Sequence, residues 1–207
     1  MTNFLFIRHG AHDYLGRAVA GRLPGVRLNE LGREQASHLP ERLSLLPIDA
    51  VYSGPLERVR ETAEPICRRF DLPLQVADEF TEIDFGEWTD RTFAELDGDA
   101  KWKIFNSYRS STTPPGGEWM LEVQARVLRR LAELRTRYRF VVIVSHGDAI
   151  RATIAHFLGL PLDLFQRIEI DPASLSLVEC GDDYVRIRLL NAPWNGSPLE
   201  LPGVRHQ

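Results

Sequence analysis

The sequence of 207 residues predicts an α/β fold with three layers, α/β/α, around a mostly parallel central sheet. Short apolar runs alternate along the chain with longer segments of helical periodicity, which is the pattern of helices covering both faces of a sheet. The runs at 3–7 and 140–144 are continuously apolar, as in parallel strands buried on both faces. Near the end, two runs flank Gly181-Asp182-Asp183 and predict an antiparallel hairpin at the edge of the sheet.

The first half of the chain reads as strand, helix, strand, helix, strand. After the strand at 3–7, Asn29 opens a helix that extends to about Ser44, with apolar residues at roughly helical spacing. Pro55 suits the first turn of the next helix. In chain order, these elements are a strand at 3–7, a helix at 29–44, a strand at 48–53, a helix at 56–70 and a short strand at 72–77.

Residues 78–117 are acidic, aromatic and rich in turn residues, and they predict an insertion over the sheet and the active site rather than a second domain. A helix near 99–109 and a Pro-Pro-Gly-Gly stop at 114–117 are the regular features expected there. The later elements are a helix at 118–138, a central strand at 140–144, a helix at 148–158, and hairpin strands at 174–180 and 184–190.

We therefore expect one domain over residues 1–207, with the chain from Asn191 lying over the surface. No repeat and no low-complexity linker divides the chain.

Composition and charge are those of an ordinary globular protein. Hydrophobic residues make up 43% and charged residues 26% of the chain. The net charge of −4 argues against a nucleic-acid binder, although it permits one basic pocket. Cys67 and Cys180 form neither a disulfide framework nor a zinc site, and they fit a reducing compartment. With no apolar stretch long enough for a signal peptide or a membrane span, we expect a cytoplasmic protein.

Two turns of similar sequence point to a site. "NFLFIRHG" at 3–10 and "RFVVIVSHGD" at 139–148 each run a buried strand directly into a histidine and a glycine. Ligands of open α/β sheets bind beyond the carboxyl ends of the strands. If the two strands are neighbours, the His9 and His146 rings face one another across one pocket. Asp148 is expected to cap the following helix, whose amides favour an anion.

Either histidine alone would as readily be a buried turn residue as a functional one. The repetition, with Arg8 beside His9, favours an anion site.

Several motifs in order resemble the histidine phosphatase superfamily, also called the phosphoglycerate mutase-like family. They are Arg8-His9-Gly10, a stretch from Ser53 to Ala63 that contains Pro55, Leu56, Arg58 and Thr62, the run Glu82-Ile-Asp-Phe-Gly86-Glu-Trp88, and Ser145-His146-Gly147. "LNELGREQA" at 28–36 and "PGGE" at 115–118 add to the similarity, which extends from about residue 4 to 158.

The chemistry of a phosphomonoester suits these residues. A neutral imidazole can approach a dianion that repels a carboxylate, so His9 is the expected nucleophile, and nearby cations keep it unprotonated. Arg8 and Arg58 offer planar forks to phosphate oxygens, and His146 as an imidazolium is expected to add a third cationic donor, together with the backbone at Gly147. Arg60 is expected to be a solvated residue.

The resemblance gives the role of proton donor to Glu82, which later activates water. From the residues alone, Asp84 and Glu87 in the same acidic loop stay as alternatives. The resemblance thus implies a metal-independent phosphatase that works through a phosphohistidine on His9, without a cofactor, on a small phosphorylated metabolite. The sequence indicates no membrane or nucleic-acid partner and no particular oligomeric state.

The chain departs from the family pattern after the first glycine. Leu15 stands where the mutases have an asparagine, and His12 where a serine or threonine is usual. Leu15 therefore disfavours phosphoglycerate as the substrate. His12 either contacts the substrate or caps the turn.

Three other functions remain as alternatives. They are a phosphoglycerate mutase-type phosphomutase, a non-catalytic phosphate-binding module, and a metal hydrolase using His9, His12 and Asp13. The last lacks further ligands at suitable spacing.

Aromatic residues are concentrated in the insertion. We expect most of them to pack it onto the sheet, and some, with Tyr14 or Leu15, to line the pocket entrance. That lining favours a partly apolar or ring-bearing alcohol. The aromatic residues are Phe80, Phe85, Trp88, Phe93, Trp102, Phe105 and Tyr108.

Overall fold

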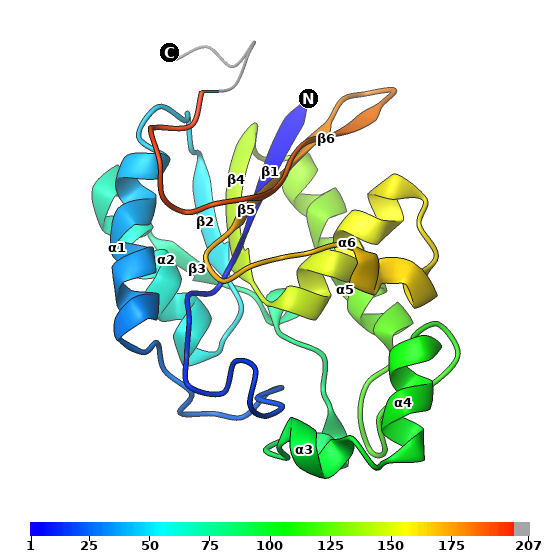
Figure 1. The fold of residues 1–207 in the computed structure, drawn as a ribbon. Helices are drawn as coiled ribbons and strands as arrows, with labels where there is room; N and C mark the ends of the chain where they lie inside the picture. Colours follow the sequence, from blue (N-terminus) through cyan, green and yellow to red (C-terminus); the bar gives the residue numbers. More distant parts are fainter. Residues whose placement is uncertain (201–207) are drawn as a thin grey trace.

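Six strands form one sheet in the order β3-β2-β4-β1-β5-β6 (Figure 1). The computed structural model describes residues 1–200. The four strands β3, β2, β4 and β1 are parallel. Strand β5 pairs antiparallel with β1, and β6 pairs antiparallel with β5, so β5 and β6 form a hairpin at the edge of the sheet. The strands are β1 (Thr2–Arg8), β2 (Ala50–Ser53), β3 (Leu74–Val76), β4 (Phe140–Ser145), β5 (Leu175–Cys180) and β6 (Val185–Ala192).

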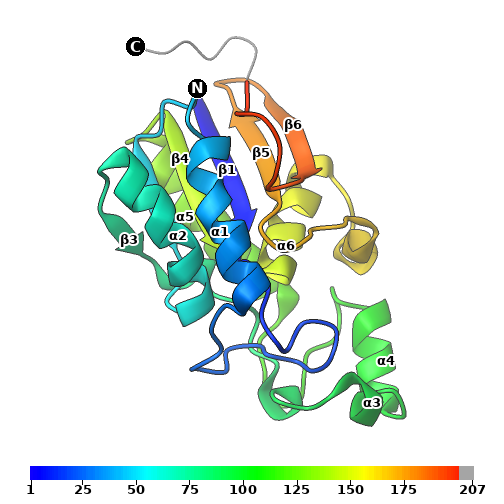
Figure 2. The ribbon, with the colours of Figure 1, turned by 60° about the vertical axis from the view of Figure 1, so that its left-hand side comes forward.

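Helices cover both faces of this sheet. Helices α1 and α2 lie on one face, and α5 and α6 lie on the other (Figures 1 and 2). The helices are α1 (Glu30–Arg42), α2 (Glu57–Phe70), α3 (Phe93–Leu96), α4 (Ala100–Ser107), α5 (Met120–Arg135) and α6 (Gly147–Leu158), and short 3-10 helices lie at Asp78–Phe80, Gly86–Trp88 and Leu162–Arg167. The predicted three-layer fold with its edge hairpin is confirmed. No helix within residues 1–200 combines the length and the apolar character needed to cross a bilayer.

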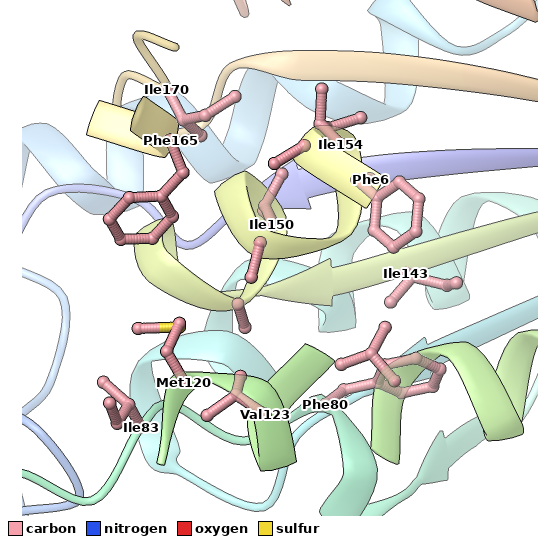
Figure 3. Packing of buried hydrophobic residues seen from close by; sticks show 14 of the residues in the cluster. Phe6, Phe80, Ile83, Met120, Val123, Ile143, Ile150, Ile154, Phe165 and Ile170 are labelled. Atoms are coloured by element: carbon pink, nitrogen blue, oxygen red, sulfur yellow. The ribbon is translucent and has the colours of Figure 1, made fainter. Parts of the chain in front are cut away.

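Alternate residues of the central strands supply two separate cores. Leu5 and Ile7 of β1 pack with α1 and α2, whereas Phe4 and Phe6 face α5 and α6. Figure 3 shows the second core, in which Phe6 and residues of α5 and α6 interdigitate. Burial of β1 and β4 on both faces explains their continuously apolar sequences.

The pairing of β1 with β4 sets the position of the site. The two strands are parallel and adjacent, and Arg8 stands opposite Ser145. His9 and His146 directly follow the ends of these two strands, so both lie at the same edge of the sheet. The condition on which the facing of the two histidines depended, that these strands are neighbours, is met.

The segment at 78–117 differs in detail from the expectation. It contains the predicted helix, as α4, but also α3 and two 3-10 helices that the turn-rich sequence did not indicate. Figure 1 shows α3 and α4 beyond the end of the sheet toward which β1 and β4 run. That residues 1–207 form one domain stays a prediction, and residues 201–207 lie outside the described part of the chain.

The predicted cap of α6 is wrong. The residue at the N-cap position is His146, which makes no side-chain capping bond. Asp148 instead forms ion pairs with Arg109 and Arg151, at 2.9 and 3.1 Å. Two charged donors from outside the first turn compete successfully with the helix amides for this carboxylate.

Helix α1 begins against the loop that follows β1. The Asn29 side chain caps the helix by accepting from the Gly32 amide at 2.9 Å, and the Ala11 amide donates to Gln35 Oε1 at 2.8 Å. A Cβ atom on Gly32 would collide with the backbone of Ala11, and one on Gly10 would come within 2.7 Å of the Gly32 carbonyl oxygen. The two glycines therefore permit the close approach that holds the His9 loop in place.

We predict that Gly32→Ala destabilises the protein. The substitution should gain about 1 kcal/mol of helix propensity, but the clash with Ala11 should outweigh it and leave a net loss of about 2 kcal/mol or more in the free energy of unfolding. Urea denaturation measures the difference. Gly98→Ala, where a Cβ atom meets nothing within 4 Å, is the control and should stay close to wild type. Equal stability of the two variants would contradict the account of this contact.

Candidate active site

A cavity of about 270 Å³ opens at the carboxyl ends of β1 and β4. Its wall includes most of the predicted site residues, namely Arg8, His9, His12, Tyr14, Leu15, Arg58, Glu82 and Gly147. His146 lies behind this wall, completely buried, with its ring centroid 5.2 Å from that of His9. The structure thus brings together residues from four separate motifs.

A backbone carbonyl selects the tautomer of His9. The His9 Nδ1 atom lies 2.8 Å from the Gly10 carbonyl oxygen. A carbonyl oxygen can only accept, so Nδ1 carries the proton and Nε2 keeps its lone pair. The pKa of His9 is held well below its usual value, first by burial and then by the charges of Arg58 and Arg8. His9 is therefore a neutral imidazole with a free Nε2 lone pair at pH 7.

The His146 ring has the opposite tautomer. Its Nδ1 atom lies 3.3 Å from Arg58 Nη2. A guanidinium only donates, so Nδ1 accepts and Nε2 carries the proton. This Nε2 atom is buried and has no hydrogen-bond partner within residues 1–200.

The predicted imidazolium at His146 is wrong. Burial, followed by the charges of Arg58 and of His9, holds the pKa of His146 well below its usual value. The sequence shows a histidine close to an anion site but does not show how completely the ring is removed from water. His146 is a neutral donor in this pocket.

Two arginines have free donors at the site. Arg58, in the first turn of α2, is 1% exposed and donates through Nη2 to the Gly21 carbonyl at 2.6 Å. Arg8 donates through Nη1 to the Ile170 carbonyl at 2.6 Å. Within residues 1–200, Arg58 Nε and Nη1 and Arg8 Nε are buried without a partner. Burial lowers the pKa of Arg58 to about 10, which leaves it charged at pH 7.

Thr62 fixes Arg58 relative to the first histidine loop. Its hydroxyl donates to the Arg58 carbonyl at 2.7 Å and accepts from the Gly10 amide at 3.0 Å. One side chain of α2 thus joins the helix to the turn that carries His9. Arg60 on the same helix is exposed, as predicted.

Of the three candidate acids, Glu82 is the one on the cavity wall. Its Oε1 atom accepts from the Ile83 amide at 3.0 Å. Burial, followed by the negative charge of Asp148, raises the pKa of Glu82, and Arg58 and Arg8 oppose the shift only in part. Asp84 is held by the Gly86 amide at 2.8 Å, and Glu87 is exposed.

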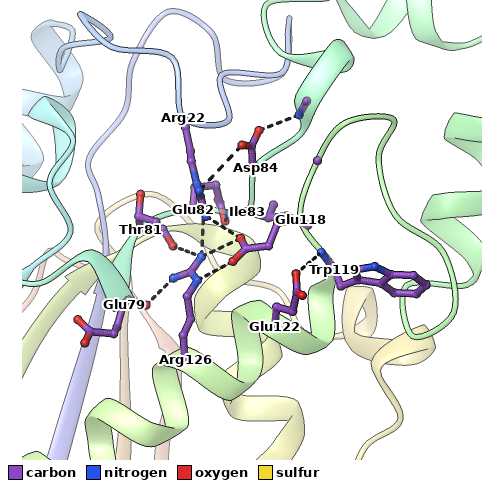
Figure 4. Close-up of polar contacts among 12 residues, drawn as sticks. Arg22, Glu79, Thr81, Glu82, Ile83, Asp84, Glu118, Trp119, Glu122 and Arg126 are labelled. Carbon is purple, nitrogen blue, oxygen red and sulfur yellow. Dashed lines mark hydrogen bonds and ion pairs between the residues drawn. The ribbon is translucent and has the colours of Figure 1, made fainter.

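The backbone of Glu82 is held by two arginines. Its carbonyl oxygen accepts from Arg22 Nε at 2.8 Å and from Arg126 Nη2 at 3.2 Å (Figure 4). Both arginines also bond to the carboxylate of Glu118, at 2.6 and 3.0 Å. Glu118 belongs to the "PGGE" motif, which does not itself indicate this role, and nothing in the local sequence singles out Arg22 or Arg126.

A second ion-pair group, also missed from the sequence, joins the insertion to α6. Arg109 is 3% exposed, lies 4.0 Å above the Phe105 ring, and pairs with Asp148, which pairs in turn with Arg151. All three charged residues line the cavity. They meet only in the tertiary structure, since Arg109 precedes Asp148 by almost forty residues of chain.

The predicted substrate contacts lie at the cavity, with one additional feature at His12. His12, Tyr14 and Leu15 all line the wall. The His12 Nδ1 atom also accepts from the Tyr14 amide at 3.3 Å, so this histidine both caps the turn and faces the cavity.

The aromatic residues of the insertion divide as expected into packing and lining residues. Phe85, Phe93 and Trp102 line the cavity. Phe80, Trp88 and Phe105 are buried in the core. Tyr108 is 56% exposed and is not among the residues that line the cavity.

The three residues of the alternative metal site do not converge. The Asp13 carboxylate accepts from Asn29 Nδ2 at 3.1 Å at the surface. Among residues 1–200, no three His, Cys, Asp or Glu side chains lie together in a way that could hold a metal ion.

Comparison with known proteins identifies the family. A sequence profile of the histidine phosphatase superfamily (branch 1) matches residues 4–193. The chain belongs to this superfamily.

The bifunctional protein Rv2228c of Mycobacterium tuberculosis is 34% identical over 92% of this chain, and the chain spans only 54% of that relative's length. Phosphoserine phosphatase 1 of Hydrogenobacter thermophilus is 31% identical over 86% of each chain. Among solved structures, mycobacterial glucosyl-3-phosphoglycerate phosphatase Rv2419c, complexed with VO3, superposes with a TM-score of 0.85 at 30% identity. The match covers 93% of this chain and all of that one.

We predict that the buried neutral histidines make stability depend on pH. The pKa of His146 is depressed in the folded state, so below about pH 6.5 the unfolded state binds a proton that the native state does not. Stability from this group is thus complete above pH 6.5 and is lost as the pH falls below it. His146→Gln should therefore make the dependence of unfolding free energy on pH between 6 and 5 shallower by about 1.4 kcal/mol per pH unit.

Urea denaturation in phosphate-free buffer at several pH values measures the slope. His38→Gln, which replaces an exposed histidine on α1, is the matched control and should keep the wild-type slope. If His146→Gln kept it as well, His146 would not be buried in its neutral form.

Proposed function

We propose that this protein hydrolyses phosphomonoesters without a metal, through a phosphohistidine formed on His9. The single observation that carries the proposal is the hydrogen bond from His9 Nδ1 to the Gly10 carbonyl oxygen, at 2.8 Å. It leaves the Nε2 lone pair as a nucleophile beside two arginines. Family membership and the names of the relatives, which include a phosphoserine phosphatase and a glucosyl-3-phosphoglycerate phosphatase, support hydrolysis.

Arg8, Arg58 and His146 hold the phosphoryl group in this proposal, together with the backbone at Gly147. The unpartnered donors of the two arginines and the Nε2–H of His146 are polar groups that a phosphoryl oxygen would satisfy. Preorganised donors of this kind stabilise the charge on the equatorial oxygens during transfer. A bound dianion would also raise the pKa of both histidines and so offset the effect of the arginines.

The reaction proceeds in two steps. His9 Nε2 attacks phosphorus, the bond from phosphorus to the alcohol oxygen breaks, and Glu82 gives its proton to the leaving alkoxide. Glu82, now a carboxylate, takes a proton from water as the hydroxide attacks phosphorus and the P–N bond breaks. Orthophosphate leaves, and His9 returns to its neutral form. The raised pKa of Glu82 supports the first of these roles.

The alcohol is a partly apolar or ring-bearing one in this proposal. Phe85, Phe93 and Trp102 offer an aromatic wall beside Leu15, and the mutase asparagine is replaced by that leucine. Cys67 and Cys180 are free and buried, which supports action in a reducing cytoplasm.

We predict that His9 becomes phosphorylated during turnover. Rapid acid-free quenching with a radiolabelled aryl phosphate should trap an acid-labile, alkali-stable label, and peptide mapping should locate it at His9. His9→Ala should lose the label and reduce kcat by about a thousandfold or more. His38→Ala should keep both. Label on another residue, or full turnover by His9→Ala, would refute the covalent mechanism.

We predict that the effect of Glu82→Gln depends on the leaving group. An alkyl phosphate needs a proton on its poor leaving group, so its kcat should fall by about a hundredfold or more. With p-nitrophenyl phosphate, whose phenolate leaves readily, the fall should be much smaller. Glu87→Gln, an exposed acid of the same loop, is the matched control and should not separate the two substrates. Equal losses by Glu82→Gln on both substrates would indicate a positioning role instead.

A further inference from the structure

The proposed mechanism leaves one buried, cavity-lining imidazole without a chemical role. His12 is 4% exposed, lines the cavity, and has its ring centroid 4.9 Å from that of His9. It follows the glycine turn by two residues and comes from the same loop. A turn cap alone does not require an imidazole, because an asparagine or aspartate side chain caps such turns with a smaller group.

The backbone orients the His12 ring. The Tyr14 amide can only donate, so the His12 Nδ1 atom, at 3.3 Å, accepts from it. The proton of the neutral ring is therefore on Nε2, at the opposite edge. Burial, followed by the charges of Arg58 and Arg8, lowers the pKa of His12 to about 4. At pH 7 the ring is thus a neutral donor of fixed tautomer.

That donor is available to a ligand. Within residues 1–200, the bond at Nδ1 is the only hydrogen bond of the His12 ring. The ring lines the cavity together with Arg8 and Arg58, the two arginines of the anion site. The Asp13 carboxylate turns away to Asn29 at the surface. Arg8, Arg58 and His12 therefore line the same cavity as His9.

We propose that His12 is a further phosphate-binding residue, whose Nε2–H donates to a non-bridging oxygen of the phosphoryl group. The inference rests on the proposed function. A neutral donor adds a hydrogen bond to the oxyanion without adding another positive charge against His9, whose lone pair must stay available. The second nitrogen meanwhile caps the turn, so one ring links the shape of the loop to the binding of the anion.

Two amide variants separate the two nitrogens. The side-chain oxygen of His12→Asn can replace Nδ1 as the cap but cannot reach the position of Nε2. The amide nitrogen of His12→Gln can replace the Nε2–H donor. His12→Asn should raise the inhibition constant of orthophosphate and of vanadate roughly tenfold to a hundredfold, as expected for a hydrogen bond to a charged group. It should lower kcat/KM for p-nitrophenyl phosphate by a similar factor. His12→Gln should stay within a few fold of wild type for both.

Control variants distinguish a lost phosphate contact in His12→Asn from misfolding of the variant. His38→Asn and His38→Gln, which carry the same substitutions on the exposed face of α1, should match wild type. The melting temperature of each variant is measured without phosphate. Wild-type inhibition constants in His12→Asn would overturn the proposal and leave His12 as a turn cap. Equal losses in both His12 variants, with lowered melting temperatures, would also overturn it.

A loss of kcat/KM without a change in phosphate or vanadate inhibition would place the contact on the leaving group and overturn the proposal as well. Calorimetric titration with orthophosphate tests the contact independently of turnover. If the wild-type protein bound phosphate through His12 but hydrolysed no phosphomonoester, the proposed function would fail and the phosphate contact would stand.

Discussion

The parallel pairing of β1 with β4 is the constraint on which the site depends. Arg8 stands opposite Ser145 in this register, so the histidines that follow are neighbours across the strand ends. Each strand is buried on both faces, with alternate residues in two different cores. A slip of one residue would exchange these cores and separate the two imidazoles, so packing along the whole strand fixes the geometry at its end.

Burial then determines the chemistry of the groups gathered there. His9 and His146 are both neutral because the protein removes them from water beside Arg58 and Arg8. A carbonyl acceptor and a guanidinium donor assign opposite tautomers to the two rings, so one presents a lone pair and the other an N–H. The same burial favours the protonated form of Glu82. Burial thus favours the protonation states that the proposed mechanism needs in His9, His146 and Glu82, and it leaves buried polar atoms that an oxyanion would pair.

The fold and the positions of His9 and His146 could be predicted from the sequence because both depend on local patterns. Continuous apolar runs identify β1 and β4, and a histidine after each run places it at the strand end. The charge state of His146 could not be predicted, because it depends on complete burial by elements distant in sequence. The prediction that Asp148 caps α6 was wrong for a related reason. Its carboxylate forms an ion pair with Arg109, which lies in the insertion and is distant in sequence. Helix α3, only four residues long, is too short to produce a detectable period.

The insertion and the sheet contribute different residues to the cavity. The sheet edge and the first turn of α2 carry His9, Arg8 and Arg58 on elements held by two cores, where small displacements are resisted. The aromatic wall comes from the insertion, which is tied to this base by two charged groups: Arg109 with Asp148, and Glu118 with the two arginines that hold the Glu82 backbone. The backbone of Glu82 is therefore held both from the loop after β1, by Arg22, and from α5, by Arg126. In the proposed function, a change of sequence in the wall would alter which alcohol fits, while the ion pairs would keep Glu82 at the cavity, so specificity could change without loss of the reaction.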